Sequence, residues 1–478
     1  MVNIFSLSAP KWYGIILLQI GLGLSCIFMP WYVVIPLSIS CALITLLFIR
    51  FKWWAYLFVF FIPLTPKNPG FALEQVRIDS SMEALPFSIF LSVIAAFIII
   101  FHKSAGLYKE TMKSPLFIPS LLFICYSFLT FFWSPAHIRS NLHYFIYLIA
   151  DISLFYFLFH VIDNEKFHKR LMWCLVFSGL VLSLQVFQSF YPINVNDIKF
   201  EIFDWLSFHI YHKPGKGKNA GWFSSPALTA ITLNIIIFVA MGLLLTETSR
   251  AKIWFLRIVI VILSLAVFLI GNKGGTWSLV MVLYFILFIS KVLRKNFLRN
   301  AFIIFIIIFI LFVPTKMLSK RGTSRLVTVS ATGQSSMELR IQYWKEGFRQ
   351  LSKRAVTPFG LGIGGYNDVN TVGVAQPHNL YFQMFFDFGF MGLIIVCAFM
   401  FPLARMFLAT INHQETYLQN MSIAFAGAFI CIGIDALVSI TYYFSVLWLL
   451  LALGSSTFYM TQKELLEEKQ ITDTKSHS

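Results

Sequence analysis

The chain has 478 residues, of which 58% are hydrophobic and only 12% are charged. Soluble domains carry about 25% charged residues, so this composition excludes an ordinary soluble protein and indicates one that lies in a membrane. The net charge of +16 does not indicate a nucleic-acid partner, because basic loops and anionic lipid headgroups explain it in a membrane protein. All six cysteines lie in apolar runs, which argues against a disulfide framework or a cysteine-based metal site.

Apolar runs long enough to cross a bilayer, about 20 residues each, recur along almost the whole chain. They predict an all-α fold, namely a polytopic bundle of about 12–14 transmembrane helices. Its largest loop is predicted to contain short amphipathic helices. The predicted segments are N-terminal transmembrane helices (1–190), a loop (191–221), central transmembrane helices (222–313), a large loop (314–377), C-terminal transmembrane helices (378–460) and a disordered tail (461–478).

The distribution of Lys and Arg predicts how the bundle is oriented. Every second loop holds most of the basic residues, and the positive-inside rule assigns these loops and both chain ends to the cytoplasm. Three segments on the outer side break the rule, namely the two longer loops and the very short turn 271–275. Loop 191–221 ends in a lysine-rich stretch, and loop 314–377 carries nine Lys or Arg residues against three Asp or Glu. Positive charge on that side has no role in topology, so we expect it to hold an anion.

His378 lies where the basic outer loop meets the next apolar run. Its reference pKa of about 6.5 lets it exchange protons near neutral pH, as a general base for an alcohol acceptor must. The alternative is a histidine at the membrane interface that only satisfies a backbone group. Asn379 is placed to hydrogen-bond a sugar or to orient the imidazole. The other histidines show no metal-ligand spacing such as H-E-x-x-H, so we expect neither a metal nor another cofactor.

Three outer cations are candidates for binding the anion. Lys218 precedes the first central span, Lys273 lies in a very short glycine-flanked turn, and Arg340 lies on an amphipathic helix predicted within 335–353. A charge at the membrane edge is costly unless it has a partner or a function. Arginine is well suited to bidentate phosphate contacts. The alternative for both lysines is that they only reach out to lipid phosphates.

A glycine-rich stretch lies between Arg340 and His378, with glycines at positions 360, 362, 364 and 365. It lacks a Walker lysine and a preceding strand, which argues against nucleotide binding. Two interpretations remain open for it. The first is a turn that presents backbone N–H groups to a substrate, with Gly362 as a positioning residue. The second is a purely structural turn.

Three acids within the predicted spans keep a non-enzymatic function in consideration. Asp151, Asp387 and Asp435 either serve proton-coupled transport or are neutralised by buried partners. A transporter or flippase for lipid-linked sugars should place its cations in a cavity along the spans. Here the cations lie at the outer ends and in one large outer loop, which favours chemistry at that surface.

Four pieces of sequence, taken in this order, carry a family resemblance. Residues 218–226 (KNAGWFSSP) are similar to an R-x-x-G-x-F-x-N-P entry to a span, and residues 272–275 (NKGG) are similar to an S-R-G turn. Arg340 with Trp344, followed by a G-x-G turn and by His378-Asn379, completes the set. Over roughly Lys218 to Gly392 the chain therefore resembles the bacterial O-antigen ligase and polymerase family of polytopic glycosyltransferases. It departs from that pattern at Lys218 and Lys273, where lysine keeps the charge of the family's arginine but loses its planar fork, and Ser225-Pro226 replaces Asn-Pro.

The resemblance implies a metal-independent, inverting transfer of a glycan from an undecaprenyl-diphosphate carrier to a sugar hydroxyl in the periplasm. Lys218, Lys273 and Arg340 would neutralise the diphosphate and His378 would take the acceptor proton, while Asn379 and Gly362 would position the acceptor or substrate. The implied protein is an O-antigen ligase acting on lipid A–core in lipopolysaccharide biosynthesis. An O-antigen or exopolysaccharide polymerase and a protein O-glycosylating relative are the alternatives. The implied location is the bacterial inner membrane, with both termini cytoplasmic and with donor, acceptor and membrane lipids as partners.

Overall fold

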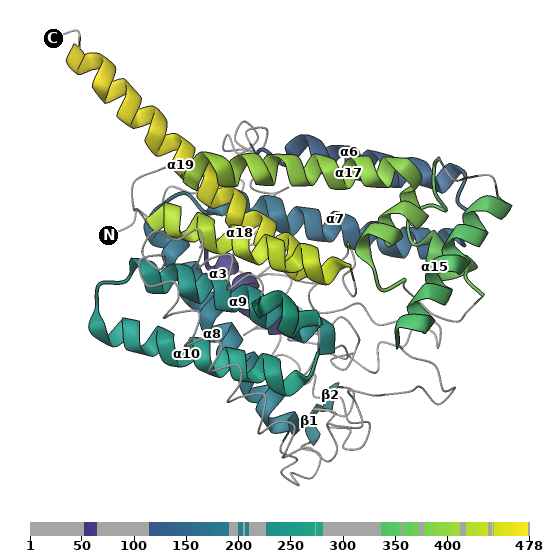
Figure 1. Cartoon of the computed structure of the whole chain (residues 1–478), viewed down its shortest axis with the longest axis horizontal. Coiled ribbons are helices and arrows are strands. Elements are labelled where there is room, and N and C mark those ends of the chain that lie inside the picture. The colour runs from purple at the N-terminus through teal and green to yellow at the C-terminus, as the bar shows by residue number, and fades with distance from the viewer. Residues whose placement is uncertain are drawn as a thin grey trace, which may run out of the picture. The chain divides into compact units, whose positions relative to one another are not determined.

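The computed structural model describes most of the chain from residue 114 onward and one earlier helix (Figure 1). The chain forms two compact units, Met1–Leu57 and Phe58–Ser478. The helical bundle described below belongs to the second unit. The described residues are 52–64, 114–190, 199–203, 206–209, 226–272, 274–280, 336–354, 356, 358–371, 377–411, 417–437, 442 and 444–476.

The described helices confirm the predicted all-α, polytopic membrane fold. Six of them are long and apolar enough to cross a membrane. They are α7 (Ile138–Val161), α8 (Glu165–Phe190), α9 (Pro226–Thr246), α10 (Arg250–Ile270), α17 (Leu380–Ile411) and α18 (Tyr417–Ala436). The predicted total of about 12–14 spans includes apolar runs outside the described residues, so that number stays a prediction.

Shorter elements accompany these spans. A β-hairpin of two antiparallel strands, paired from Lys199 with His209, lies within the predicted loop 191–221 and leaves the fold class unchanged. The other elements are α3 (Lys52–Phe61), η2 (Ile62–Leu64), α6 (Phe117–Leu129), η4 (Thr130–Phe132), β1 (Lys199–Phe203), β2 (Leu206–His209), α15 (Ser336–Lys353), α16 (Gly365–Val369) and α19 (Ser445–Ser476). Helix α19 continues through most of the segment 461–478, for which the sequence predicts a disordered tail.

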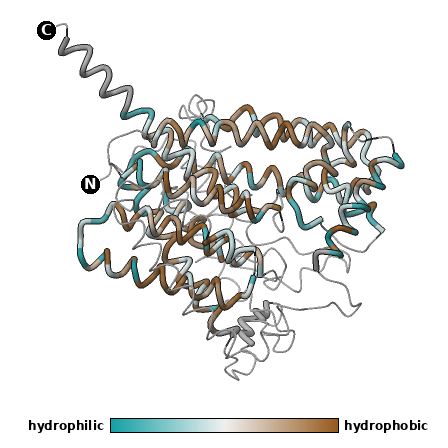
Figure 2. Tube along the Cα trace, in the orientation of Figure 1, coloured by the Kyte–Doolittle hydropathy of each residue, from teal (hydrophilic) through white to brown (hydrophobic). Residues whose placement is uncertain are grey.

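Helix α9 is the central helix of the described bundle, packed against α8, α10 and α18. It begins at Pro226, a residue that suits the first position of a helix because its missing N–H would have no helical partner there. It is apolar on all sides, as expected for a helix surrounded by others. Gly179 of α8 allows close packing, because a Cβ there would lie 2.7 Å from the Ile236 side chain. Figure 2 shows the spans as mainly hydrophobic tubes, with hydrophilic residues gathered at their ends and on α15.

Helix α17 is interrupted at Gly389, where the backbone adopts φ 62° and ψ −147°. The break frees two carbonyl groups of the preceding turn for partners outside the helix. The N–H of Leu361 donates to Phe386 O at 2.8 Å, and the N–H of Gly362 donates to Asp387 O at 2.8 Å. The interruption therefore attaches the glycine-rich stretch to α17.

The loops of the bundle separate into two ends. At one end, His168 on α8 contacts the Tyr417 hydroxyl of α18 at 2.7 Å, and Lys169 pairs with Glu247 after α9 at 3.0 Å. At the other end, the loop before α7 meets the glycine-rich stretch through the Ser134 hydroxyl, which donates to Leu361 O at 2.8 Å. The first end carries loops predicted to be cytoplasmic, and the second carries loops predicted to be outer. This grouping agrees with the alternation of basic loops.

Candidate active site

Helix α15 carries Arg340 and caps one end of the bundle. Its bounds, Ser336–Lys353, match the amphipathic helix expected from the sequence. Its apolar face packs on the first turns of α17, where the rings of Trp344 and Phe382 are 5.0 Å apart. A side chain at Gly347 would collide with the ring of Phe386, so glycine allows α15 to lie directly on α17. Figure 1 shows α15 beside the end of α17.

His378 is exposed at this end and has an unusual backbone conformation. Its φ of 52° is left-handed, which few residues other than glycine adopt and which persists only where the surroundings enforce it. Both neighbours are fixed. The indole N–H of Trp344 donates to Pro377 O at 2.9 Å, and the Asn379 side-chain oxygen accepts the N–H of Phe382 at 2.9 Å. The strained conformation therefore sets the direction in which the imidazole leaves the chain.

Tyr343 of α15 lies beside His378, and Arg340, one turn earlier on the same helix, acts on His378 through its charge. The Tyr343 and His378 rings have centroids 6.3 Å apart. The protein around the imidazole removes part of its water, and this lowers the pKa of His378, with the charge of Arg340 lowering it further. Burial also lowers the pKa of Arg340, although a guanidinium stays protonated in proteins. The pair thus combines a neutral imidazole, able to accept a proton, with a permanent cation.

Asn379 is buried and uses both ends of its amide within the protein. Its oxygen caps the first turn of α17, and its nitrogen donates to Leu437 O, just after α18, at 2.9 Å. Of the two roles expected for Asn379, this geometry suits orientation of the adjacent His378 better than direct contact with a sugar.

The glycine-rich stretch has no backbone donor left for a substrate between Gly360 and Tyr366. Each N–H in that run donates to a protein acceptor, at distances from 2.7 to 3.2 Å. Gly362 has φ 87°, and a side chain there would collide with Ser134. The geometry therefore favours the structural interpretation, in which Gly362 acts on the site by shaping the turn.

Asp387 and Asp435 have buried hydrogen-bond partners. Asp387 accepts the N–H of Tyr366 at 3.0 Å and the hydroxyl of Tyr442 at 3.1 Å. Asp435 accepts the Ser278 hydroxyl at 2.9 Å. The first acid attaches the glycine-rich stretch to α17, and the second attaches residues 274–280 to α18. These contacts match the alternative that the sequence left open, in which buried partners neutralise the acids.

Lys218 and Lys273 lie outside the described residues, so the structure does not place them. The residues on either side of Lys273 are described. The Asn272 side-chain oxygen accepts the N–H of Gly275 at 2.9 Å, and Gly275 O accepts the Asn234 amide at 2.8 Å. A Cβ on Gly275 would lie 2.6 Å from the Ala230 side chain, so this glycine allows close helix packing.

The sequence reasoning missed several residues that build this end of the molecule. Tyr343 could have been found, because it lies one turn after Arg340 on the same predicted helix face. Asp368 had no such signal. It accepts the His137 N–H at 2.9 Å and the Ser140 hydroxyl at 2.8 Å, both more than two hundred positions away in the chain. Among the described residues, no group of three or more His, Cys, Asp or Glu side chains forms a candidate metal site.

The fold and this site define a polytopic membrane protein with a histidine–arginine pair on a polar cap at one end of its bundle. A family model described as O-antigen ligase matches residues 258–397, which include Arg340 and His378. This match supports the resemblance to the O-antigen ligase and polymerase family that the sequence motifs carry. The family implies a glycosyltransferase-like membrane enzyme with a lipid-linked glycan substrate. No curated protein matches the chain.

Proposed function

We propose that the protein is an O-antigen ligase that moves a glycan from an undecaprenyl-diphosphate carrier to a hydroxyl group of lipid A–core. The proposal places the enzyme in the bacterial inner membrane, with the α15 end facing the periplasm and both termini cytoplasmic. The observation that carries it is the juxtaposition of His378 with Arg340, within the part of the chain that matches the ligase family. A proton acceptor beside a cation is what transfer from a diphosphate needs.

In the proposed reaction, a ring nitrogen of His378 accepts the proton of the acceptor hydroxyl. The acceptor oxygen attacks the anomeric carbon of the donor, and the bond from that carbon to the diphosphate oxygen breaks. The diphosphate carrier leaves with the bonding electron pair, and attack from the opposite face inverts the anomeric carbon. Arg340, joined by Lys218 and Lys273, stabilises the negative charge that develops on the leaving group. The diphosphate linkage provides the driving force, so the step needs no nucleotide or metal.

The lowered pKa of His378 supports its role as the base, because the imidazole is then neutral and able to accept a proton at neutral pH. Asn379 and Gly362 act as positioning residues in this proposal, through the helix cap and the glycine-rich turn that they form. The membrane confines donor and acceptor to one leaflet, which favours their productive encounter.

The test measures glycan transfer in membranes supplied with purified lipid-linked donor and lipid A–core acceptor. We expect His378→Ala and Lys273→Ala to reduce transfer strongly, and Lys273→Arg to retain it. His137→Ala is the matched control, because His137 is an exposed histidine at the same end of the bundle. Transfer by His378→Ala at the wild-type rate would refute the general-base role.

The same assay separates the other activities considered above. Glycan found on lipid A–core supports the ligase, whereas glycan lengthened on its carrier would identify a polymerase. Movement of donor across the bilayer without transfer would identify a flippase. Each outcome is read from the chemical form and the location of the labelled glycan.

A further inference from the structure

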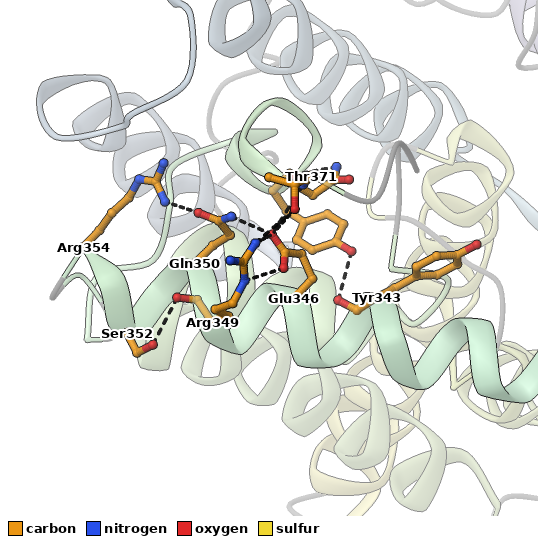
Figure 3. Close-up of polar contacts among 9 residues, drawn as sticks. Tyr343, Glu346, Arg349, Gln350, Ser352, Arg354 and Thr371 are labelled. Carbon is orange, nitrogen blue, oxygen red and sulfur yellow. Dashed lines mark hydrogen bonds and ion pairs between the residues drawn. The ribbon is translucent and has the colours of Figure 1, made fainter.

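The carboxylate of Glu346 is the buried centre of a polar cluster on α15 (Figure 3). The residue is only 6% exposed. Arg349 donates to both carboxylate oxygens at 2.6 Å, and Gln350 donates to one of them at 2.6 Å. The hydroxyl of Thr371 donates at 3.0 Å and also accepts from Arg349 at 3.0 Å. The hydrogen bond from Arg349 lowers the pKa of Glu346 to about 2 against the opposing effect of burial, so the carboxylate stays charged.

The Thr371 contact differs in kind from the others. Arg349 and Gln350 lie one turn after Glu346 on α15. Contacts between residues one turn apart also form in isolated helices. Thr371 lies seven positions before His378, and both its hydroxyl, at 3.0 Å, and its backbone N–H, at 3.4 Å, donate to Glu346, so these bonds join two separate parts of the chain. Trp344, half a turn before Glu346, makes another such bond when it donates to Pro377 O at 2.9 Å. Helix α15 therefore binds both Thr371 and Pro377, and Pro377 directly precedes His378.

Arg340 lies on the same helix, one turn before Trp344. The rotation of α15 about its axis and its position along that axis therefore decide where the guanidinium of Arg340 lies relative to the imidazole of His378. A further bond, from the Tyr366 hydroxyl to Tyr343 O at 3.0 Å, fixes the intervening turn of α15 to the glycine-rich stretch. We infer that Glu346 is a positioning residue: its bond to Thr371 clamps α15 to the loop before His378 and so holds Arg340 beside the imidazole. This inference rests on the proposed function, because it concerns the same pair.

The clamp makes a distinct electrostatic prediction. Tyr343 of α15 lies beside His378, and Arg340 on the same helix is the charged group that lowers the pKa of His378. Titratable side chains from neighbouring elements at this end include Tyr381, which donates to Gly433 O at 3.1 Å, and Asp435, which accepts from Ser278 at 2.9 Å. Neither contacts the clamp. Releasing α15 should therefore change the pKa of His378 through Arg340.

The experiment measures how fast diethyl pyrocarbonate modifies His378 as a function of pH in the purified full-length protein. Only the neutral imidazole reacts, so the midpoint of the profile reports the pKa of His378, and mass spectrometry of its peptide identifies the site. Glu346→Gln removes the charge with little change in shape, and Thr371→Val removes only the hydroxyl. Thr371→Ser keeps the hydroxyl. Ser352→Ala is the matched control, because Ser352 lies on α15 and donates only to Arg349 O, at 3.0 Å.

We expect Thr371→Val to raise the midpoint by up to about 0.5 pH unit, the size that loss of a nearby cation gives at a water-facing site. Glu346→Gln keeps an oxygen that can accept from Thr371, so its midpoint should rise less. Thr371→Ser and Ser352→Ala should match the wild type. An unchanged midpoint in Thr371→Val that melts like the wild type would overturn the inference, and the same variant decides the matter if Glu346→Gln does not fold. The measurement needs no substrate. A shifted midpoint in a protein that transfers no glycan supports the clamp while refuting the proposed function.

Discussion

The indole N–H of Trp344 donates to the carbonyl oxygen of Pro377 at 2.9 Å, and this bond fixes the residue immediately before His378. Trp344→Phe removes the donor and keeps an aromatic ring against Phe382. A single hydrogen bond contributes about 1 kcal/mol, so a roughly five-fold lower transfer rate is expected if the whole bond serves catalysis. Glycan transfer by purified protein measures the effect. Trp254→Phe is the control, because Trp254 is exposed on α10 at the opposite end. Equal losses in both variants would contradict the role of the bond.

The features that the sequence predicted well are those encoded locally. The amphipathic spacing of residues 336–353 depends only on the period of one helix. The structure begins α15 within one residue of the expected start. The alternation of basic loops likewise depends only on counting charges between apolar runs. The grouping of Arg340 with His378 follows from their shared loop, and the charge of Arg340 lowers the pKa of His378.

Features that depend on distant partners were not predictable. The glycine-rich stretch remained ambiguous because its acceptors lie elsewhere, for example Thr130, 233 positions before Ile363. The sequence leaves Asp387 open between proton-coupled transport and neutralisation by a buried partner, because that partner, Tyr442, lies 55 positions away in the chain. The interruption of α17 at Gly389 is hidden within an apolar run that reads as one continuous span. In each case a single sequence contains the residue but not its neighbour in space.

A pair of glycine substitutions tests the structural interpretation of the turn. Gly362 and Gly271 both have positive φ, 87° and 69°, so alanine strains the backbone at either position. A side chain at Gly362 also collides with Ser134, whereas nothing lies within 4 Å of one at Gly271. We expect Gly271→Ala to cost about 1 kcal/mol and Gly362→Ala about 1–3 kcal/mol more. Thermal unfolding in detergent measures both, and equal destabilisation would show that the turn does not require the contact with Ser134.

The contact between Asp387 and Tyr442 predicts coupled destabilisation. Asp387→Ala leaves the buried N–H of Tyr366 and the hydroxyl of Tyr442 without their acceptor, and each such group costs about 1–3 kcal/mol. Tyr442→Phe removes the other partner of the contact. The double variant should lose less stability than the sum of the two single losses, because the first change has already broken the shared bond. Denaturation of all four proteins measures the coupling, and strict additivity would show that the contact carries no energy.

The pH dependence of transfer tests the pairing of Arg340 with His378. A general base must be neutral, so the acid limb of the profile follows its pKa. The pKa of His378 lies below its usual value because the surrounding protein removes part of the water around the imidazole and because Arg340 is charged. The acid limb of the wild type should therefore lie below a pH of about 6.5. Arg340→Gln removes the cation, which lets the pKa rise and moves the limb to higher pH by about 0.5 unit.

Arg340→Lys is the matched control for this shift, because it keeps the charge and loses the planar fork. Its transfer rate should fall if Arg340 holds the diphosphate bidentately, but its acid limb should stay near that of the wild type. The position of the limb and the height of the plateau therefore report two separate functions of one residue. A limb that stays in place in Arg340→Gln would show that the guanidinium does not act on the base, and its role would then be confined to the leaving group.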